Sequence, residues 1–256
     1  MRTLFRIAAF IFSLYGFLIF LIGMVLLMPF FLIAFLQKPL AGGNSILRLS
    51  GIWADFFFFM TGIHCKVISE SPPDINRQYI FVSNHISYLD IPMMVKVIRK
   101  QRYRILGKAE MTRIPVFGSI YRRGTVSVDR ESAAARKASV QRLIRFIGKG
   151  ISVFICPEGT FNTTGQPLKS FYDGAFRIAI ETQQPIKPVI FPDTYDRLNY
   201  KSIFSLNPGS SRAVWLEETT TEGMTLEDMP ELKETIYRQM ENALIRYKAG
   251  WIKDTD

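Results

Sequence analysis

Tyr79-Ile80-Phe81-Val82-Ser83-Asn84-His85-Ile86-Ser87-Tyr88-Leu89-Asp90 is the stretch around which this chain is organised. Its first four residues are apolar and predict a buried strand. Apolar residues at helical spacing follow over 91–98, and Pro92 suits the first turn of a helix. A histidine therefore stands where a strand ends, and a carboxylate stands five residues later, where a helix begins.

The chain reversal between this strand and this helix can bring Asp90 back onto the imidazole of His85. A carboxylate that holds one ring nitrogen fixes the tautomer and leaves the other nitrogen free to act as a base. The same residues also have a purely structural interpretation. A histidine at a strand end is often structural, and the Ser87-x-x-Asp90 pattern can be a capping box. The spacing alone leaves both interpretations open.

Composition limits the class of protein. The 256 residues are enough for one globular domain with an additional segment, and 21% charged residues exclude a wholly membrane-embedded chain. Cys65 and Cys156 match no zinc or redox spacing and suggest a reducing compartment. His64 and His85 are the two histidines, which excludes a histidine-rich metal site. No serine lies in a Gly-x-Ser-x-Gly elbow, so we expect no acyl-enzyme nucleophile.

Positive charge is concentrated in one part of the chain. The formal net charge is +10, and the stretch 99–130 holds nine Lys or Arg against two acidic residues. Such a local excess favours an anionic partner, although a solvated face is the alternative. We expect no nucleic-acid partner, because no nucleic-acid-binding motif is present. A phosphorylated lipid, coenzyme A or an acidic carrier protein fits better.

The N-terminal part predicts a membrane anchor over 1–63. Residues 7–37 carry no charge, and a helix of that length would extend ~46 Å, more than the ~30 Å hydrocarbon core of a bilayer requires. Glycine and proline at 37–44 predict a turn. Residues 46–63 then predict an amphipathic helix that lies in the membrane interface or packs on the first helix.

The remainder, 64–256, predicts one α/β domain. Alternating strands and helices favour a mixed sheet covered by helices. The helices are expected over 91–99, 132–147 and 172–182, with a last one opened by Pro230. The strands are expected near 65–68, 79–83, 104–106, 125–128, 151–156, 186–190 and 212–216.

Three further motifs follow the His85 stretch. Gly107-Lys108-Ala109-Glu110-Met111 leads to a segment that ends at Val128-Asp129-Arg130, and its cations could clamp a phosphate. Pro157-Glu158-Gly159-Thr160 predicts a turn in which Glu158 could orient backbone N–H groups, bind a substrate hydroxyl or hold a cation. An apolar block, 185–189, comes last and could equally be core.

Together, these four ordered blocks over about 79–192 resemble the signatures of the glycerolipid acyltransferases, the family that includes the 1-acylglycerol-3-phosphate acyltransferases. The resemblance implies that His85 is the general base and Asp90 its orienting partner. It implies that the substrate is bound by residues around them, and that the basic ones hold its phosphate. Those residues are Asn84, Ser87, Lys108, Arg130, Glu158, Gly159, Thr160 and Phe161.

From this resemblance we expect a membrane-bound enzyme that moves a fatty acyl chain from acyl-coenzyme A or acyl carrier protein to a lysolipid hydroxyl. The acceptor expected first is 1-acylglycerol 3-phosphate, which gives phosphatidate. No metal or bound cofactor is expected, and membrane lipid is an expected partner. Basic residues near the apolar run favour the cytoplasmic face for the catalytic domain, at the inner membrane if the source is bacterial. The alternatives are another lysolipid as acceptor, or a non-catalytic lipid-binding protein.

One position departs from the family pattern. Relatives usually carry arginine directly after Pro-Glu-Gly-Thr, where it is assigned to the phosphate of the acceptor, but this chain has Phe161. Lys108, Arg130 or Lys169 could hold the phosphate instead. Alternatively, the acceptor lacks a terminal phosphate and its head group packs against Phe161.

Overall fold

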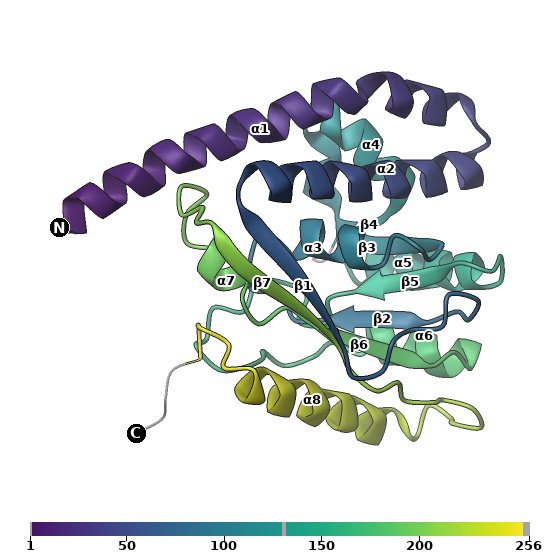
Figure 1. Cartoon of the computed structure of the whole chain (residues 1–256). Helices are drawn as coiled ribbons and strands as arrows, with labels where there is room; N and C mark the ends of the chain where they lie inside the picture. Colours follow the sequence, from purple (N-terminus) through teal and green to yellow (C-terminus); the bar gives the residue numbers. More distant parts are fainter. Residues whose placement is uncertain (1, 130–131, 253–256) are drawn as a thin grey trace.

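The computed structural model describes residues 2–129 and 132–252, and a seven-stranded sheet forms its centre (Figure 1). The strand order is β1-β7-β6-β2-β5-β3-β4. This confirms the predicted mixed sheet covered by helices. The strands are β1 (Ile63–Ser69), β2 (Ile80–Ser83), β3 (Tyr103–Lys108), β4 (Thr125–Val128), β5 (Ser152–Ile155), β6 (Ile186–Ile190) and β7 (Gly209–Trp215).

The direction of the strands decides which loops meet. β4, β3, β5, β2 and β6 are parallel neighbours, so all five end at one edge of the sheet. β7 is antiparallel to β6, and β1 is parallel to β7, so those two strands end at the opposite edge. β2 lies between β5 and β6 and is buried on both faces, which explains its unbroken apolar run.

Consecutive side chains of β2 enter two different cores. Ile80 and Val82 pack on the face that carries α5 (Ala133–Ile147), α6 (Gly174–Thr182) and α8 (Met229–Arg246). Phe81 packs on the opposite face, beneath α2 (Pro39–Met60) and α3 (Asp90–Val97). The shorter elements are the 3-10 helix η1 (Ala109–Arg113), α4 (Phe117–Gly124) and α7 (Thr194–Arg197).

Helix α2 begins earlier than the sequence predicts. The predicted turn over 37–44 is wrong, because α2 already starts at Pro39 and contains Gly42 and Gly43. Proline suits the first turn of a helix, and the two glycines allow close approach. A Cβ at position 42 would lie 2.3 Å from the carbonyl oxygen of Ala34, and one at position 43 would lie 2.6 Å from that of Arg123. The helix also ends at Met60 rather than at residue 63.

Two polar residues of α2, Asn44 and Asp55, contact the protein body. Asn44 Oδ1 accepts a hydrogen bond of 2.8 Å from the buried Arg104 of β3. Asp55 forms ion pairs with Lys96 and Arg99 at the end of α3. Because apolar residues of α2 also enter the core over α3, the anchor segment and the α/β domain share one hydrophobic core.

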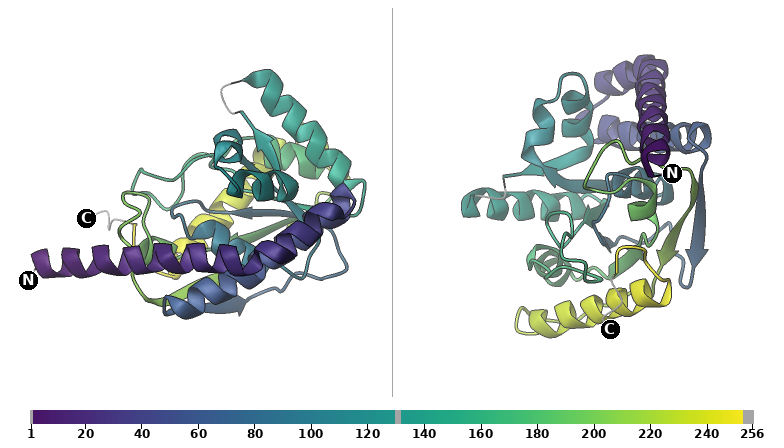
Figure 2. Two further views of the ribbon diagram at one scale, coloured as in Figure 1. Left: turned by 90° about the horizontal axis from the view of Figure 1, so that it is seen from above. Right: turned by 90° about the vertical axis from the view of Figure 1, so that its left-hand side faces the viewer.

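Helix α1 (Arg2–Leu36) lies along α2 on the outside of the body (Figures 1 and 2). A narrow seam that includes Ser13, Ile19, Phe31 and Ala34 is buried. Over 7–36 the helix is long and apolar enough to cross a membrane. The large apolar side chains on its outer side are exposed: Ile7, Phe10, Ile11, Leu14, Phe17, Leu18, Leu21, Ile22, Val25, Leu26, Phe30, Leu32, Ile33 and Leu36.

Candidate active site

The candidate site lies where the parallel strands β2 and β5 end side by side. The loop after β2 carries His85, and the loop after β5 carries Glu158. Two hydrogen bonds to the backbone of His85 join these loops directly. Glu158 Oε1 accepts from the N–H of His85 at 2.8 Å, and the carbonyl of His85 accepts from the N–H of Asn162 at 2.7 Å. The histidine backbone is therefore fixed from both sides.

His85 and Asp90 meet as the sequence predicts. His85 Nδ1 lies 2.9 Å from Asp90 Oδ2. The same carboxylate oxygen accepts hydrogen bonds from the backbone N–H groups of Ile86 at 2.7 Å and Ser87 at 2.8 Å. Since Asp90 is fully buried and acts as the acceptor, the imidazole carries its proton on Nδ1 and directs Nε2 away from Asp90. The His85 side chain retains 18% exposure, so Nε2 is available as a base.

The other oxygen of Asp90 has a partner that sequence reasoning missed. Thr194 Oγ1 donates to Asp90 Oδ1 at 2.6 Å, and Thr194 is itself fully buried at the start of α7. The preceding residue, Asp193, forms a two-pronged ion pair with Arg212 of β7, with contacts of 2.8 and 2.6 Å. Thr194 is thus anchored to the sheet while it holds the carboxylate. Because 104 positions separate Thr194 from Asp90, no local pattern could reveal this pair.

Glu158 acts inside the protein. It is fully buried, and its second oxygen accepts from the backbone N–H of Lys169 at 2.8 Å. Burial raises the pKa of Glu158 to about 8, against the opposing effect of the two backbone N–H groups. Of the three predicted roles for Glu158, these contacts favour the orientation of backbone groups, because both oxygens are occupied by the loops that carry the site.

Asn84 and Ser87, both predicted to bind substrate, are also buried and bonded to backbone. Asn84 exchanges two hydrogen bonds with Phe191, accepting from its N–H at 2.8 Å and donating to its carbonyl at 3.3 Å. Ser87 Oγ accepts from the N–H of Leu89 and donates to the carbonyl of Leu198. Both residues therefore shape the loop that presents His85.

Phe161 lies against the candidate base. Its ring centroid is 4.4 Å from that of His85, 5.0 Å from that of Tyr88 and 6.2 Å from that of Tyr200. Position 161, where the family resemblance implies arginine, is therefore part of an aromatic cluster (His85, Tyr88, Phe161, Tyr200) beside the candidate base. A neighbouring cation remains, because Lys169 Nζ donates to Thr160 Oγ1 at 2.9 Å.

Gly159 is required by the turn that carries these residues. Its φ of 73° lies in the left-handed region, and a Cβ there would come within 2.7 Å of the Tyr172 ring. The backbone N–H of Gly159 donates to the carbonyl of Cys156 at 3.0 Å and closes the turn. Glycine at this position thus allows the loop after β5 to bend tightly beside His85.

A comparison with protein families decides the class. The model of the acyltransferase family matches residues 63–192, about half of the chain, and this span contains His85, Asp90 and Glu158. The chain belongs to the acyltransferase family. It is therefore an enzyme that transfers an acyl group, and the interpretation as a non-catalytic lipid-binding protein is set aside.

Individual relatives agree with this assignment. The chain is 28% identical over 207 residues to human 1-acyl-sn-glycerol-3-phosphate acyltransferase beta, covering 80% of this chain and 74% of that protein. It is 28% identical over 198 residues to the mouse alpha enzyme of the same name, covering 77% of this chain and 68% of that protein. The crystal structure of the 1-acyl-sn-glycerophosphate acyltransferase PlsC from Thermotoga maritima covers 99% of this chain with a TM-score of 0.77 at 23% identity, a likeness in fold.

Lys108, one of the basic residues predicted to hold phosphate, lies two strands away from β2. Lys108 ends β3, at the same edge of the acyltransferase sheet as His85, and its Nζ lies 3.3 Å from Glu110. The side chain of Lys108 is 55% exposed, so solvent surrounds it. Arg130 lies outside the described residues. Strand β4, which ends two residues before it, runs parallel to β3 and directs the chain toward this edge.

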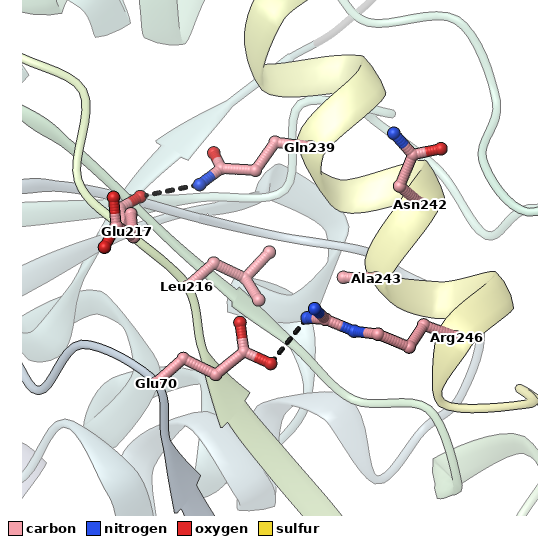
Figure 3. A pocket seen from close by; sticks show the side chains of 7 residues that line it. All are labelled: Glu70, Leu216, Glu217, Gln239, Asn242, Ala243 and Arg246. Atoms are coloured by element: carbon pink, nitrogen blue, oxygen red, sulfur yellow. Dashed lines mark hydrogen bonds and ion pairs between the residues drawn. The ribbon is translucent and has the colours of Figure 1, made fainter.

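A shallow pocket elsewhere on the acyltransferase is formed by the ends of β1 and β7 and by α8 (Figure 3). Gln239 Nε2 donates to the carbonyl of Glu217 there at 3.0 Å, and Glu70 pairs with Arg246. β1 and β7 run opposite to the other strands, so this pocket lies at the far edge of the sheet from His85. None of the predicted site residues lines it.

Proposed function

We propose that this acyltransferase moves a fatty acyl group from a thioester donor to the free hydroxyl of 1-acylglycerol 3-phosphate, which gives phosphatidate. The observation that carries the proposal is the bond between His85 Nδ1 and the buried Asp90, which leaves Nε2 as the base. The names of the human and mouse relatives support this acceptor.

In the proposed reaction, His85 Nε2 takes the proton of the acceptor hydroxyl as its oxygen attacks the thioester carbon. The tetrahedral intermediate then expels the sulfur, and His85 returns its proton to the leaving thiolate. Asp90 keeps the imidazole oriented and stabilises the imidazolium between the two steps. The donor, acyl-coenzyme A or acyl carrier protein, brings its own activated carbonyl. The protein therefore needs to supply only position and proton transfer, and we propose no bound cofactor or metal.

The phosphate of the acceptor is assigned to the cations around the same sheet edge. Lys169, held beside Phe161 by Thr160, is a described cation near the aromatic cluster, and Lys201 Nζ lies 5.9 Å from the ring centroid of Tyr200. Lys108 lies two strands away, roughly 10 Å at the usual spacing between strands, and its long exposed side chain could extend toward the acceptor phosphate. Arg130 completes the proposed set.

We further propose that α1 anchors the enzyme in one leaflet. The buried seam of α1 extends from Ser13 to Ala34, so the helix runs along the body for most of its length. A helix held in this way cannot cross a bilayer without pulling the body into the hydrocarbon region. Its exposed apolar side would instead enter the leaflet from the cytoplasmic face, which remains our assignment for the body.

A panel of acceptors tests the proposal. Purified enzyme would be given acyl-coenzyme A or acyl carrier protein with lysophosphatidate, lysophosphatidylglycerol, lysophosphatidylcholine and a lyso-amino-acid lipid, and thiol release would be followed. We expect lysophosphatidate to give the highest kcat/KM. Turnover of a phosphate-free lysolipid without turnover of lysophosphatidate would contradict the acceptor assignment and leave the reaction class intact.

A further inference from the structure

The loop 198–208, between α7 and β7, connects the active site with the N-terminal helix. In Figure 1 and in the right view of Figure 2 it extends from the sheet toward the first half of α1. Leu206 is buried, and its backbone N–H donates to Ser13 Oγ of α1 at 3.0 Å. Gly16 permits this approach, because a Cβ there would lie 2.2 Å from Leu206 Cδ2. The loop is thus seated on α1.

The other end of the loop reaches the catalytic turn. The carbonyl of Leu198 accepts from Ser87 Oγ, and Asn199 forms a bridge with Ser87. Tyr200 then stacks on Phe161 in the aromatic cluster beside His85. A few residues of the loop therefore link the aromatic cluster beside His85 to the apolar helix α1.

Hydrogen bonds inside the loop turn its polar groups inward. Ser205 Oγ accepts from the N–H of Asn199 at 3.1 Å and donates to the carbonyl of Ser202 at 2.6 Å. Asn199 Oδ1 accepts from the N–H of Lys201 at 3.0 Å, and Ser202 Oγ accepts from the N–H of Phe204 at 3.0 Å. The N–H of Asn207 closes the base of the loop on the carbonyl of Arg197 at 2.7 Å. The loop is braced by its own polar residues.

This bracing leaves apolar side chains at the tip. Ile203 is 59% exposed and Phe204 is 43% exposed, and Lys201 beside them is also exposed. The Phe204 ring contacts Phe10 of α1 at 5.0 Å between centroids, and Phe10 belongs to the exposed apolar side of that helix. The tip therefore continues the apolar surface of α1 and adds a positive charge at its border. Clustered exposed apolar groups of this kind mark an interaction surface.

We propose that the tip 201–204 is a second lipid-contacting surface. It enters the membrane interface beside α1 and places the aromatic cluster beside His85 next to the bilayer surface. Ile203 and Phe204 contact the acyl region just below the head groups, and Lys201 pairs with lipid phosphates. Because Tyr200 borders Phe161, an acceptor that leaves the bilayer along this loop meets the aromatic cluster first. The proposal rests on the proposed anchoring by α1.

Lipid quenching at single labelled positions tests this proposal without any activity assay. Two single-cysteine proteins are made in the full chain, with Cys65 and Cys156 changed to alanine. One carries Ile203→Cys, and the other carries Ile245→Cys at a similarly exposed position on α8. An environment-sensitive fluorophore is attached to the single cysteine of each protein. Ile245 is the matched control because α8 lies on the opposite side of the sheet from α1 (Figure 1). With phosphatidylglycerol vesicles that contain a shallow spin-labelled lipid, we expect strong quenching at 203 and little at 245.

Equal quenching at 203 and 245 would overturn the proposal, whatever the enzyme acylates. Flotation of the same samples separates this result from a failure of the anchor, since an enzyme that does not float with vesicles contradicts α1 anchoring instead. Fluorescence that depends on protein concentration rather than on the spin-labelled lipid would indicate a second copy of the chain at the tip, and would also overturn the proposal.

Kinetics provide the second readout. The pair Ile203→Ser and Phe204→Ser is compared with Leu226→Ser and Ile245→Ser, which remove similarly exposed apolar groups on the α8 side. We expect the tip variant to lose about tenfold in kcat/KM for long-chain lysolipid in vesicles, from the apolar area withdrawn from lipid, and to keep wild-type kcat/KM for a monomeric short-chain acceptor. An equal loss on both acceptors would show that the tip only shapes the site, and would refute a lipid contact.

Discussion

The two halves of the catalytic sheet edge differ in how firmly they hold their polar groups. At β2 and β5, the carboxyl groups of Asp90 and Glu158 are fully buried, and every oxygen has a protein donor or the imidazole as partner. At the end of β3, Lys108 is more than half exposed, and its neighbour is the equally exposed Glu110. The buried, hydrogen-bonded part at β2 and β5 is the rigid half of this edge, and the solvent-exposed part at the end of β3 is the open half.

The difference follows from what each half has to do. Proton transfer requires a base placed to within a fraction of an ångström, so His85 is fixed through its backbone and its ring. Recognition of a phosphate tolerates looser geometry, because charge attraction extends over several ångströms and is screened by salt. Substitutions at the rigid half are therefore expected to act on kcat, and those at the open half on KM.

The largest effect is expected at the base itself. His85→Ala removes the proton acceptor, and we expect kcat to fall by at least about 10³-fold while the enzyme still folds and binds vesicles. His64→Ala, at the exposed second histidine on β1, is the matched control and should retain full activity. Wild-type transfer by purified His85→Ala would refute the mechanism.

Asp90→Asn is expected to be next in size. The amide keeps an oxygen for the backbone N–H groups of Ile86 and Ser87, but it loses the charge that stabilises an imidazolium. We expect kcat to fall by about 10²- to 10⁴-fold, with little change in KM for the donor. Steady-state kinetics with circular dichroism as a folding check will measure this. A change confined to KM would mean that Asp90 does not orient the base.

The raised pKa of the buried Glu158 predicts that the stability of the enzyme depends on pH. Its pKa is about 8 in the folded enzyme and near 4.5 when unfolded, so the native state holds an extra proton between these values. The free energy of unfolding should therefore fall as pH rises from 4.5 to 8, by at most about 1.4 kcal/mol per pH unit. Glu158→Gln, which cannot titrate, removes this contribution. Melting curves of both proteins in detergent at pH 5 to 8 should diverge, and a constant difference would show that Glu158 does not titrate in this range.

At the open half, Lys108→Ala should act mainly on affinity. We expect KM for lysophosphatidate to rise roughly three- to tenfold at low salt, because an exposed cation is worth less than a buried one. The effect should shrink at high salt. Lys100→Ala is the matched control, since Lys100 is also exposed but precedes β3 and lies near the opposite edge of the sheet. A loss in kcat alone would place Lys108 with the rigid half.

Sequence reasoning was most successful where the signal is local. The apolar run of β2, the His85 and Asp90 spacing and the Pro230 start of α8 are short patterns with direct physical causes, and the structure confirms the strand, the contact and the helix. The start of α2 was mispredicted for an equally physical reason. Gly42 and Gly43 indicate a turn locally, but tertiary packing against Ala34 and Arg123 uses their small size inside a helix.

Long-range partners could not be predicted. Thr194 looks like any threonine in a loop, and only the packing of α7 near β2 brings it to Asp90. The loop 198–208 is similar, because no local pattern shows that Ile203 and Phe204 are exposed or that Phe204 contacts Phe10. Such contacts depend on the order of strands in the sheet, which alternating apolar runs do not specify.

The smallest expected effect is at the boundary between the two halves, where Phe161 stands in the position at which relatives carry arginine. Phe161→Arg restores a guanidinium next to the Lys169–Thr160 pair, but it also removes the ring that packs on His85 and Tyr88. If lysophosphatidate is the acceptor and lysines hold its phosphate, we expect a two- to fivefold lower KM. This is about a third of what a charged hydrogen bond can contribute, because the cations repel each other. If the natural acceptor lacks a terminal phosphate and packs on the ring, the same variant should lose activity toward it and gain activity toward lysophosphatidate.

Phe161→Leu is the control, since it removes the aromatic face without adding charge. Competition between the two acceptor types, measured on wild type and both variants, separates these cases. A Phe161→Arg enzyme with unchanged preference would mean that position 161 does not contact the acceptor head group, and that selection of the acceptor depends on the open half of the edge.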